Sequence, residues 1–248
     1  MRDPSAPPHA SKMRIPYVPN PPPTASEEEA AIVSRVAARR APRPLQPLDL
    51  ALLHSPPIAD GWNSFLGAVR TRTLLAPGLR ELAICRVAAC NQAWYEWGHH
   101  APLAAAAGLG ARALEVVRKT PDLDTLGERE RSGAEEDGLG RKEWAVLRYT
   151  DEMTRCVRVA DDTFAELRAV CDEREVVEVT ATVAAYNCVS RFLVALDARQ
   201  WAREMPQGRT ISNTKMRGRW LKSRYVKNVK KASSSGPDRK HLAQTLAR

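Results

Sequence analysis

Residues 79–100 read LRELAICRVAACNQAWYEWGHH. The first half of this stretch is apolar apart from three charged side chains, Arg80, Glu81 and Arg86. Such a run predicts a helix that is buried on most of its faces. The aromatic segment from Trp94 predicts a second helix, and Gly108 and Gly110 mark its end. We therefore expect a helical hairpin, with the chain reversing just before Trp94.

The second helix of this hairpin carries residues suited to acid–base chemistry. Glu96 and His100 are four positions apart, so they lie on one helix face, where the carboxylate can orient the imidazole or share its proton. If the chain reverses between the helices, Glu81 of the first helix comes within reach of His100. We expect burial to raise the pKa of Glu81, which would suit a general acid or base near neutral pH.

Two simpler interpretations compete with catalysis at these residues. A histidine on a helix is often a core or surface residue whose hydrogen bonds are satisfied. A metal site is disfavoured, because the adjacent His99 and His100 point about 100° apart on a helix and cannot easily share an ion. Glu96 and His100 alone are too few ligands for a closed site, so we expect no metal and no cofactor.

Helical spacing of apolar residues continues along most of the chain. Further helices are predicted over residues 26–41, 59–72, 111–118, 141–156, 161–170 and 173–201. Residues 24–29 predict an N-cap with an acidic first turn, and residues 161–163 and 172–173 predict the caps of the last two helices. The valines of 176–183 continue into the last helix without a turn signal. Residues 120–140, rich in glycine and acidic residues, predict a surface loop. With no convincing strand pair, the expected fold class is all-α.

Composition divides the chain into three parts. Residues 1–24 are Pro-rich, with few apolar side chains able to share a core, and predict an extended or disordered arm. Residues 25–205 form the predicted helical domain, which is long enough to fold by burying apolar surface alone. Residues 206–248 form a basic tail that we expect to be disordered.

The net charge of +9 lies in that tail. From Asn213 onward, eleven Lys and Arg residues stand against one Asp, which sums to +10, so residues 1–212 sum to −1. A nucleic-acid-binding domain carries positive charge on its folded surface, so nucleic-acid contact is expected only through the tail. Residues 215–231 would suit a basic amphipathic helix for a membrane surface, a calmodulin-like partner or nucleic acid. A solvated extension is the alternative.

The cysteines indicate a reducing compartment. Their number is odd and no C-x-x-C pair is present, so buried free thiols are expected at Cys85, Cys90, Cys156, Cys171 and Cys188. The sequence shows no apolar core of a signal peptide and no stretch long enough for a membrane span. We expect a cytoplasmic protein.

Two separated blocks carry a recognisable pattern. The first runs from Leu79-Arg-Glu-Leu-Ala-Ile84 through Tyr95-Glu-Trp-Gly-His-His100 to Ala107-Gly-Leu109. The second contains Leu147-Arg-Tyr-Thr-Asp-Glu-Met-Thr154, Asp162-Thr-Phe164, Val176-Val-Glu-Val179 and Tyr186-Asn-Cys-Val-Ser-Arg-Phe192. Over residues 50–198 the chain thereby resembles the carboxymuconolactone decarboxylase-like family, which shares its all-helical fold with peroxidases of the alkylhydroperoxidase D type. The resemblance implies a homo-oligomer, commonly a trimer or a hexamer, with the active pocket lined by the hairpin.

The peroxidase branch of this superfamily uses a redox C-x-x-C just before the site histidine, with a glutamate one helix upstream. By position the upstream glutamate falls on Glu81 and the histidine on His100, whereas the two thiol positions fall on Ala93 and Glu96. Without these sulfurs a disulfide cycle cannot run at this site. Cys85 and Cys90 are no substitutes, because they lie five apart on a helix and point about 140° away from one another.

The pattern of the decarboxylase branch remains, in which Glu and His handle protons on a small acidic or lactone substrate. We expect His100 to act as general acid or base, Glu81 as its relay or orienting partner, and Glu96 to set the protonation state of the pair. Expected substrate-binding residues are Tyr95, His99, Asn187 and Arg191. Arg191 would hold a substrate carboxylate, or else pair with a structural acid, Asp151 or Glu152.

Two other functions remain open. One is a peroxidase-like antioxidant enzyme, which the residues at the two thiol positions disfavour. The other is a non-catalytic oligomer that acts through the basic tail.

Overall fold

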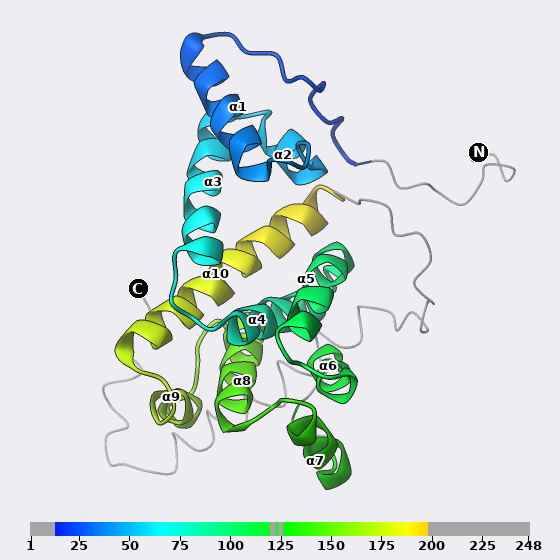
Figure 1. The fold of residues 1–248 in the computed structure, drawn as a ribbon, viewed down its shortest axis with the longest axis vertical. Coiled ribbons are helices and arrows are strands. Elements are labelled where there is room, and N and C mark those ends of the chain that lie inside the picture. The colour runs from blue at the N-terminus through cyan, green and yellow to red at the C-terminus, as the bar shows by residue number, and fades with distance from the viewer. Residues whose placement is uncertain (1–12, 120–122, 124–125, 198–248) are drawn as a thin grey trace, which may run out of the picture. The chain divides into compact units, whose positions relative to one another are not determined.

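The computed structural model describes residues 13–119, 123 and 126–197, which form ten helices and no strand (Figure 1). The predicted all-α class is confirmed. The first five helices are α1 (Glu27–Arg40), α2 (Pro47–Leu52), α3 (Pro56–Thr71), α4 (Pro77–Cys90) and α5 (Trp94–Ala106). They are followed by α6 (Ala111–Arg118), α7 (Glu128–Glu136), α8 (Arg141–Cys156), α9 (Asp161–Arg168) and α10 (Glu173–Ala195). The basic tail, the end of the last predicted helix and the first half of the Pro-rich arm lie outside the described residues.

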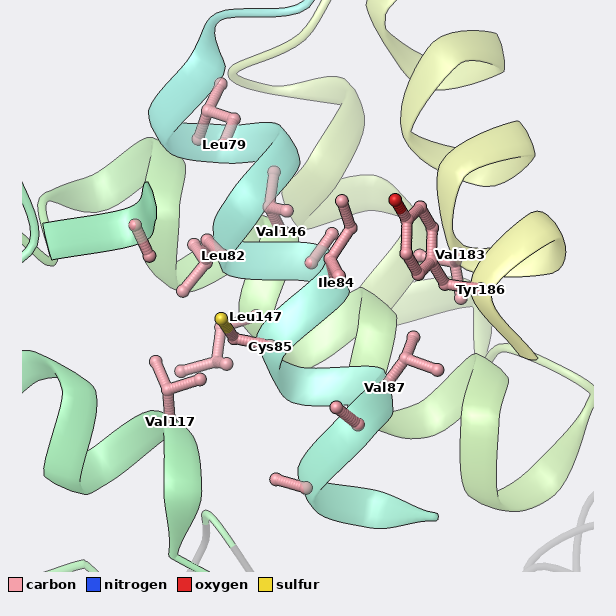
Figure 2. Close-up of a cluster of buried hydrophobic side chains, with 14 of the residues drawn as sticks. Leu79, Leu82, Ile84, Cys85, Val87, Val117, Val146, Leu147, Val183 and Tyr186 are labelled. Carbon is pink, nitrogen blue, oxygen red and sulfur yellow. The ribbon is translucent and has the colours of Figure 1, made fainter. Parts of the chain in front are cut away.

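Helix α4 lies at the centre of the domain, as its apolar sequence predicts. It packs against α5, α8 and α10, which surround it in Figure 1. Leu82, Ile84 and Val87 are completely buried, each contributing about 1.5–3 kcal/mol through the apolar surface removed from water. Figure 2 shows the α4 side chains among those of α6, α8 and α10, including Val117, Val146, Leu147 and Val183.

The connection between α4 and α5 is a three-residue turn that reverses the chain. Gln92 adopts a left-handed backbone conformation with φ of 55°. The amide of Ala93 donates to the carbonyl of Ala88 at 2.8 Å, which closes the turn. Helix α5 ends as predicted, because Gly108 (φ 109°) and Leu109 donate to the carbonyls of Ala105 and Ala104, a Schellman arrangement. The predicted hairpin is thus present.

Helices α1 to α3 form a separate layer over this hairpin. Ser26 caps α1 as predicted, since its hydroxyl accepts from the Glu29 amide at 3.2 Å. Apolar residues of the three helices form a second small core, made of Ile32, Val36, Leu52, Leu53 and Ala59. α3 also packs against α10. Arg40 at the end of α1 makes two 2.7 Å hydrogen bonds to the buried carboxylate of Asp49 in α2, which fixes the basic end of α1.

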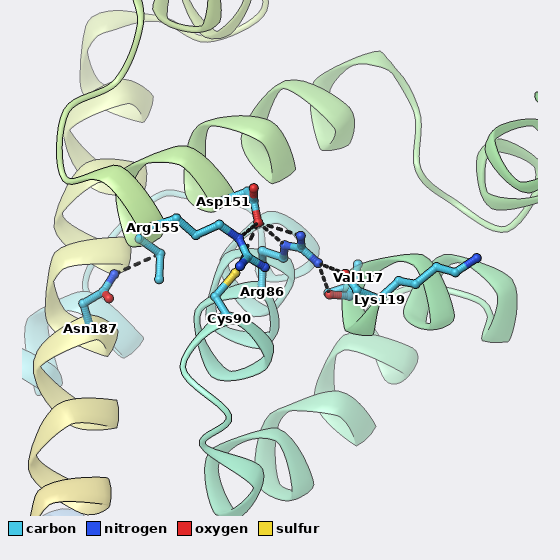
Figure 3. Close-up of polar contacts among 8 residues, drawn as sticks. Arg86, Cys90, Val117, Lys119, Asp151, Arg155 and Asn187 are labelled. Carbon is cyan, nitrogen blue, oxygen red and sulfur yellow. Dashed lines mark hydrogen bonds and ion pairs between the residues drawn. The ribbon is translucent and has the colours of Figure 1, made fainter. Parts of the chain in front are cut away.

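A buried ionic network joins α4 to α6 and α8 (Figure 3). Arg86 is completely buried, and its guanidinium donates to Asp151 and to the carbonyls of Val117 and Lys119 at 2.5–2.9 Å. Asp151 also accepts from Arg155 at 2.7 Å. Burial alone would raise the pKa of Asp151, but the two guanidinium groups hold it below its usual value. A buried charge needs this complete set of partners, because an unpaired one costs several kcal/mol.

The predicted loop over residues 120–140 is wrong in part, because it contains α7. The helix is almost entirely polar and buries only Ala134, so it lacks the apolar stripe by which helices are recognised. Polar contacts and packing against a neighbouring helix, which apolar periodicity does not reveal, stabilise α7 instead. The Gly127 amide donates to Glu130 at 3.1 Å, Lys119 pairs with Glu130, and α7 packs against α6.

The last two helices begin where predicted, but α10 ends at Ala195, before the predicted end at residue 201, and the caps differ at one position. The N-cap of α9 is Ala160, so Asp161 and Asp162 stand in the first turn rather than at the cap. Asp172 caps α10 as predicted, accepting from the Glu175 amide at 2.7 Å. The valine-rich residues 176–183 are helical, because their spacing matches a buried helix face and outweighs their β-propensity.

The described part of the Pro-rich arm is fixed to the domain. Residues 13–24 contain no helix, yet Met13 is 8% exposed and belongs to the core, with Tyr17 packed beside it. The Arg14 amide donates to the Leu196 carbonyl at 2.9 Å. This segment is extended, as one of the two expected alternatives, and Met13 and Tyr17 are among its few side chains that reach the core. None of the described helices combines the length and apolar character that a membrane crossing requires.

Candidate active site

The α4–α5 hairpin brings Glu81 and His100 into direct contact. The imidazole Nδ1 lies 2.6 Å from the Glu81 Oε2 atom, and the two residues are 6% and 4% exposed. Glu81 projects from the second turn of α4, and His100 from the middle of α5. The antiparallel course of the two helices, set by the turn at Gln92, places them side by side.

The protonation of this pair differs from the sequence expectation. Burial would raise the pKa of Glu81, but its hydrogen bond and charge interaction with His100 outweigh burial and lower that pKa, so the predicted rise is wrong. Burial also lowers the pKa of His100, against the opposing effect of Glu81. At neutral pH we infer a Glu81 carboxylate and a neutral imidazole whose Nδ1–H donates to it. This leaves a lone pair on the His100 Nε2 atom.

The free face of the imidazole borders Tyr186 of α10. The two rings meet edge to face, with centroids 5.0 Å apart. Tyr186 is 2% exposed, and burial raises the pKa of its phenol. Within the part of the chain that the structure describes, neither the His100 Nε2 atom nor the Tyr186 hydroxyl has a hydrogen-bond partner. Both atoms can therefore form a hydrogen bond with a molecule bound beside them.

Glu96 occupies a second buried position, bonded to a residue that the sequence did not single out. Its Oε2 atom accepts from the Ser190 hydroxyl of α10 at 2.5 Å, and the residue is 2% exposed. Burial raises the pKa of Glu96 to about 8, against the opposing effect of Ser190. Its Oε1 atom is buried without a partner among the described residues. The expected Glu96–His100 contact is not observed, because Glu81 holds the imidazole.

These side chains line one cavity of about 170 Å³. Glu96 and His100 border it from α5, Tyr186 and Val189 from α10, and Trp62 from α3. The Trp62 ring also packs against the Phe192 ring, with centroids 5.3 Å apart. The cavity therefore combines a neutral imidazole, a carboxyl group that tends to stay protonated, and apolar side chains on one part of its wall.

Arginine residues that the sequence analysis missed line the opposite side. Arg39 and Arg40 come from the last turn of α1, Arg43 follows that helix, and Arg70 comes from α3. Basic residues close together at the end of the first predicted helix were visible in the sequence. Their proximity to the hairpin was not, because it depends on how α1 and α3 pack over it.

One family model matches part of the chain. Residues 56–136 match the model of the carboxymuconolactone decarboxylase family. This match covers about a third of the chain. It begins at α3, ends at α7, and contains Glu81, Glu96 and His100. Among curated proteins, none matches the chain significantly.

Solved structures share the helical fold of this chain. An uncharacterized peroxidase-related protein from Silicibacter sp. TM1040 is 14% identical with a TM-score of 0.55, over 78% of this chain and 96% of its own. An alkylhydroperoxidase AhpD core from Ralstonia eutropha JMP134 is 15% identical with a TM-score of 0.55, over 70% and 86%. The debrominase Bmp8 is 13% identical with a TM-score of 0.53, over 71% and 87%. At these identities the likeness establishes the helical fold alone.

The structure brings only two of the four expected substrate-binding residues to the cavity. Tyr95 and His99 border it, with ring centroids 4.3 Å apart. Asn187 follows Tyr186 and so points to another face of α10, where its amide donates to the Thr154 hydroxyl at 3.0 Å. Arg191 donates to the Asn187 carbonyl at 3.2 Å and does not line the cavity. Its expected alternative partner Asp151 pairs with other arginines, in the network of Figure 3.

The thiol positions of the peroxidase branch hold no sulfur here. Ala93 is the N-cap of α5, and no cysteine of the described chain lines the cavity. Burial raises the pKa of Cys85 and raises the pKa of Cys90 to about 12, so neither forms a thiolate at neutral pH. Within the described residues no group of three or more His, Cys, Asp or Glu is placed to hold a metal ion.

Proposed function

We propose that this protein is an enzyme of the carboxymuconolactone decarboxylase type that performs cofactor-free acid–base chemistry on a small organic acid or lactone. The observation that carries the proposal is the buried Glu81–His100 pair, 2.6 Å apart, with its second imidazole nitrogen open to a cavity that also holds Glu96. Two titratable groups with opposite protonation preferences in one site are the arrangement expected of a general base and a general acid. The small volume of the cavity suits a small substrate.

In this mechanism the His100 Nε2 atom accepts a proton from an acidic C–H or O–H group of the substrate. The adjacent Glu81 carboxylate stabilises the imidazolium that forms, and fixes the ring so that Nε2 faces the cavity. The low exposure of both residues strengthens this interaction, because little water screens it.

For decarboxylation, the bond between the carboxylate carbon and its neighbour breaks, and carbon dioxide leaves without the bonding electron pair. That pair remains on the substrate carbon and is stabilised by a conjugated carbonyl. The protonated Glu96 then donates a proton to this carbon or to the carbonyl oxygen, and is reprotonated from solvent. Tyr186 and Tyr95 position the substrate beside these groups.

The proposal is tested by identifying the substrate and then removing each group. A small molecule recovered from the purified protein and identified by mass would supply the first candidate. His100→Ala and Glu96→Gln should both abolish its turnover while the far-ultraviolet circular dichroism stays unchanged. Full turnover by His100→Ala would refute the assignment.

A thiol peroxidase is the weaker candidate. Two solved structures of the same fold are described as peroxidase-related, but fold alone does not transfer a reaction. The buried, protonated Cys85 and Cys90 argue against a thiolate nucleophile. Peroxide reduction that survives replacement of all five cysteines would revive this function in a non-thiol form.

We also propose that the protein is a homo-oligomer, as its family resemblance implies. Large apolar side chains of different helices are exposed, including Phe65 at 47% and Val177 at 66%. Burying such side chains between subunits would remove apolar surface from water. Light scattering should give a mass that is a multiple of 27.5 kDa, and a monomer at all concentrations would contradict the proposal.

A further inference from the structure

A second cavity of about 570 Å³ adjoins the candidate active site. The two cavities share Arg39, Arg40, Arg43 and Arg70, so they adjoin at these arginines. Glu81 borders the second cavity and His100 borders the first, which places the 2.6 Å hydrogen bond between them. A substrate that reaches His100 therefore lies within reach of the second cavity as well.

The positive charge in this second cavity is mostly unbalanced. Asp49 neutralises Arg40, and Glu81, the one acidic residue among the described residues that line the cavity, is bonded to His100. Arg80 forms an ion pair with Glu81 at 3.6 Å, a distance too long for a hydrogen bond, so both Arg80 and His100 share this one carboxylate. Arg39 and Arg70 form no salt bridge with the described residues, although Asp49 attracts Arg39 and Glu81 attracts Arg70 from a greater distance. The nearby acids therefore compensate little of this charge.

Two of these guanidinium groups also have buried donors that are not used. The Nε atoms of Arg39 and Arg80 are buried without a hydrogen-bond partner among the described residues. A buried donor without a partner costs about 1–3 kcal/mol, which an anionic oxygen would recover. The side chains come from α1, α3 and α4, so their convergence is a property of the tertiary fold and not of one helix surface.

We propose that Arg39, Arg70 and Arg80 bind an oxyanion of the substrate, a carboxylate or a phosphate, that the reaction leaves in place. This deepens the proposed function and rests on it. A carboxylate that leaves as carbon dioxide gains nothing from such a site, because arginine stabilises the charged ground state. The anchored group is therefore a second acidic group, and the substrate is a dicarboxylate or a phosphorylated acid rather than a simple monoacid.

Equilibrium binding tests this site without any turnover. Succinate and inorganic phosphate are titrated calorimetrically into the full-length protein at constant ionic strength, with chloride as the reference anion. We expect saturable binding of at least one of the two, weakened about tenfold or more in both Arg39→Gln and Arg70→Gln, as loss of a charge-assisted hydrogen bond predicts. Tighter succinate binding would indicate a dicarboxylate substrate, and tighter phosphate binding a phosphorylated one.

The matched control is Arg129→Gln, an exposed arginine of α7 that lines neither cavity and should bind like the wild type. Equal affinity in all variants, or no saturable binding of either anion, would overturn the site. Arg39 and Arg70 lie on different helices. If one of the two variants does not fold, the other still tests the site.

His100→Ala separates this inference from the proposed function. It should bind the anions within about threefold of the wild type, because the arginines are intact. If His100→Ala keeps full turnover while anion binding still needs Arg70, only the acid–base function fails. If His100→Ala loses turnover while Arg70→Gln leaves the anion affinity unchanged, only the proposed anion site is refuted.

Discussion

Helix α4 carries two buried ionic groups, Glu81 and Arg86, whose surroundings differ. The guanidinium of Arg86 donates hydrogen bonds to Asp151 and to two backbone carbonyls (Figure 3). Arg86 borders neither cavity. Glu81 holds an imidazole whose other nitrogen is unused and faces a cavity. Both pairs are almost inaccessible to water, so burial does not separate them. A satisfied network holds helices together, whereas a partly satisfied one beside a cavity can act on a substrate.

The largest expected effect is on stability, at the Arg86 network. Arg86→Ala leaves Asp151 with only Arg155 as an ionic partner and two buried carbonyls without a donor. We expect the free energy of unfolding to fall by about 3–5 kcal/mol. Urea denaturation followed by circular dichroism measures it. Glu81→Gln should cost far less, because the amide oxygen still accepts from His100, and the reverse order would contradict the comparison.

The next effect is on turnover, at the Glu81–His100 pair. His100→Ala removes the general base and should lower kcat about 10²–10⁴-fold. Glu81→Gln should lower kcat less, because the imidazole remains but its protonated form loses a charged partner. Initial rates on the identified substrate measure both. A larger loss in the Glu81 variant would mean that the carboxylate itself contacts the substrate.

The pH dependence of stability should reveal Glu96. Its carboxyl keeps its proton up to about pH 8 in the folded protein but ionises near the ordinary value of 4.5 when unfolded. The unfolded state therefore binds fewer protons between these values, so the Glu96 contribution to stability falls as pH rises from about 4.5 to about 8. Glu96→Gln has no carboxyl group to ionise, so this fall in stability with rising pH is absent from the variant.

The stability of Glu96→Gln relative to the wild type should therefore rise through that window, by at most about 1.4 kcal/mol per pH unit. Urea midpoints at several pH values measure the difference. Ser190→Ala, which removes only the hydrogen bond to Glu96, is the control. Its stability should still fall as pH rises, as in the wild type. A difference that stays flat with pH would show that Glu96 ionises normally in the folded protein.

The smallest effect on turnover is expected from the cysteines. Cys85→Ala and Cys90→Ala should keep kcat within about twofold, because neither thiol borders the cavity. The Cys90 variant loses a hydrogen bond to Asp151, so a stability loss of about 1 kcal/mol is expected. Loss of turnover with an intact fold would transfer the chemistry to a thiol.

Local pattern was enough to predict the hairpin and its central pair. The uninterrupted apolar side chains of α4 indicate burial in every direction, and a short reversal places residue 81 opposite residue 100. The valine-rich part of α10 was predictable for the same reason. In contrast, α7 buries a single alanine, so periodicity carries no signal for it.

Tertiary packing explains what the sequence could not predict. The Ser190 partner of Glu96 lies 94 residues away along the chain, and the arginines reach the cavity only because α1 and α3 pack over the hairpin. The direction of the Glu81 pKa shift was mispredicted because burial was weighed without the imidazole that the hairpin places beside it. Asn187 and Arg191 were expected to bind substrate from their place in the sequence, whereas the direction of their side chains depends on the rotation of α10 about its axis.

The most direct test is the protonation of the His100 ring, followed by nitrogen-15 NMR of the protein labelled at histidine, with His100→Ala to assign the signals. At pH 7 we predict a neutral ring with the proton on Nδ1 and an unprotonated Nε2. A ring protonated on both nitrogens, or a neutral ring with its proton on Nε2, would contradict it, because no lone pair would then face the cavity.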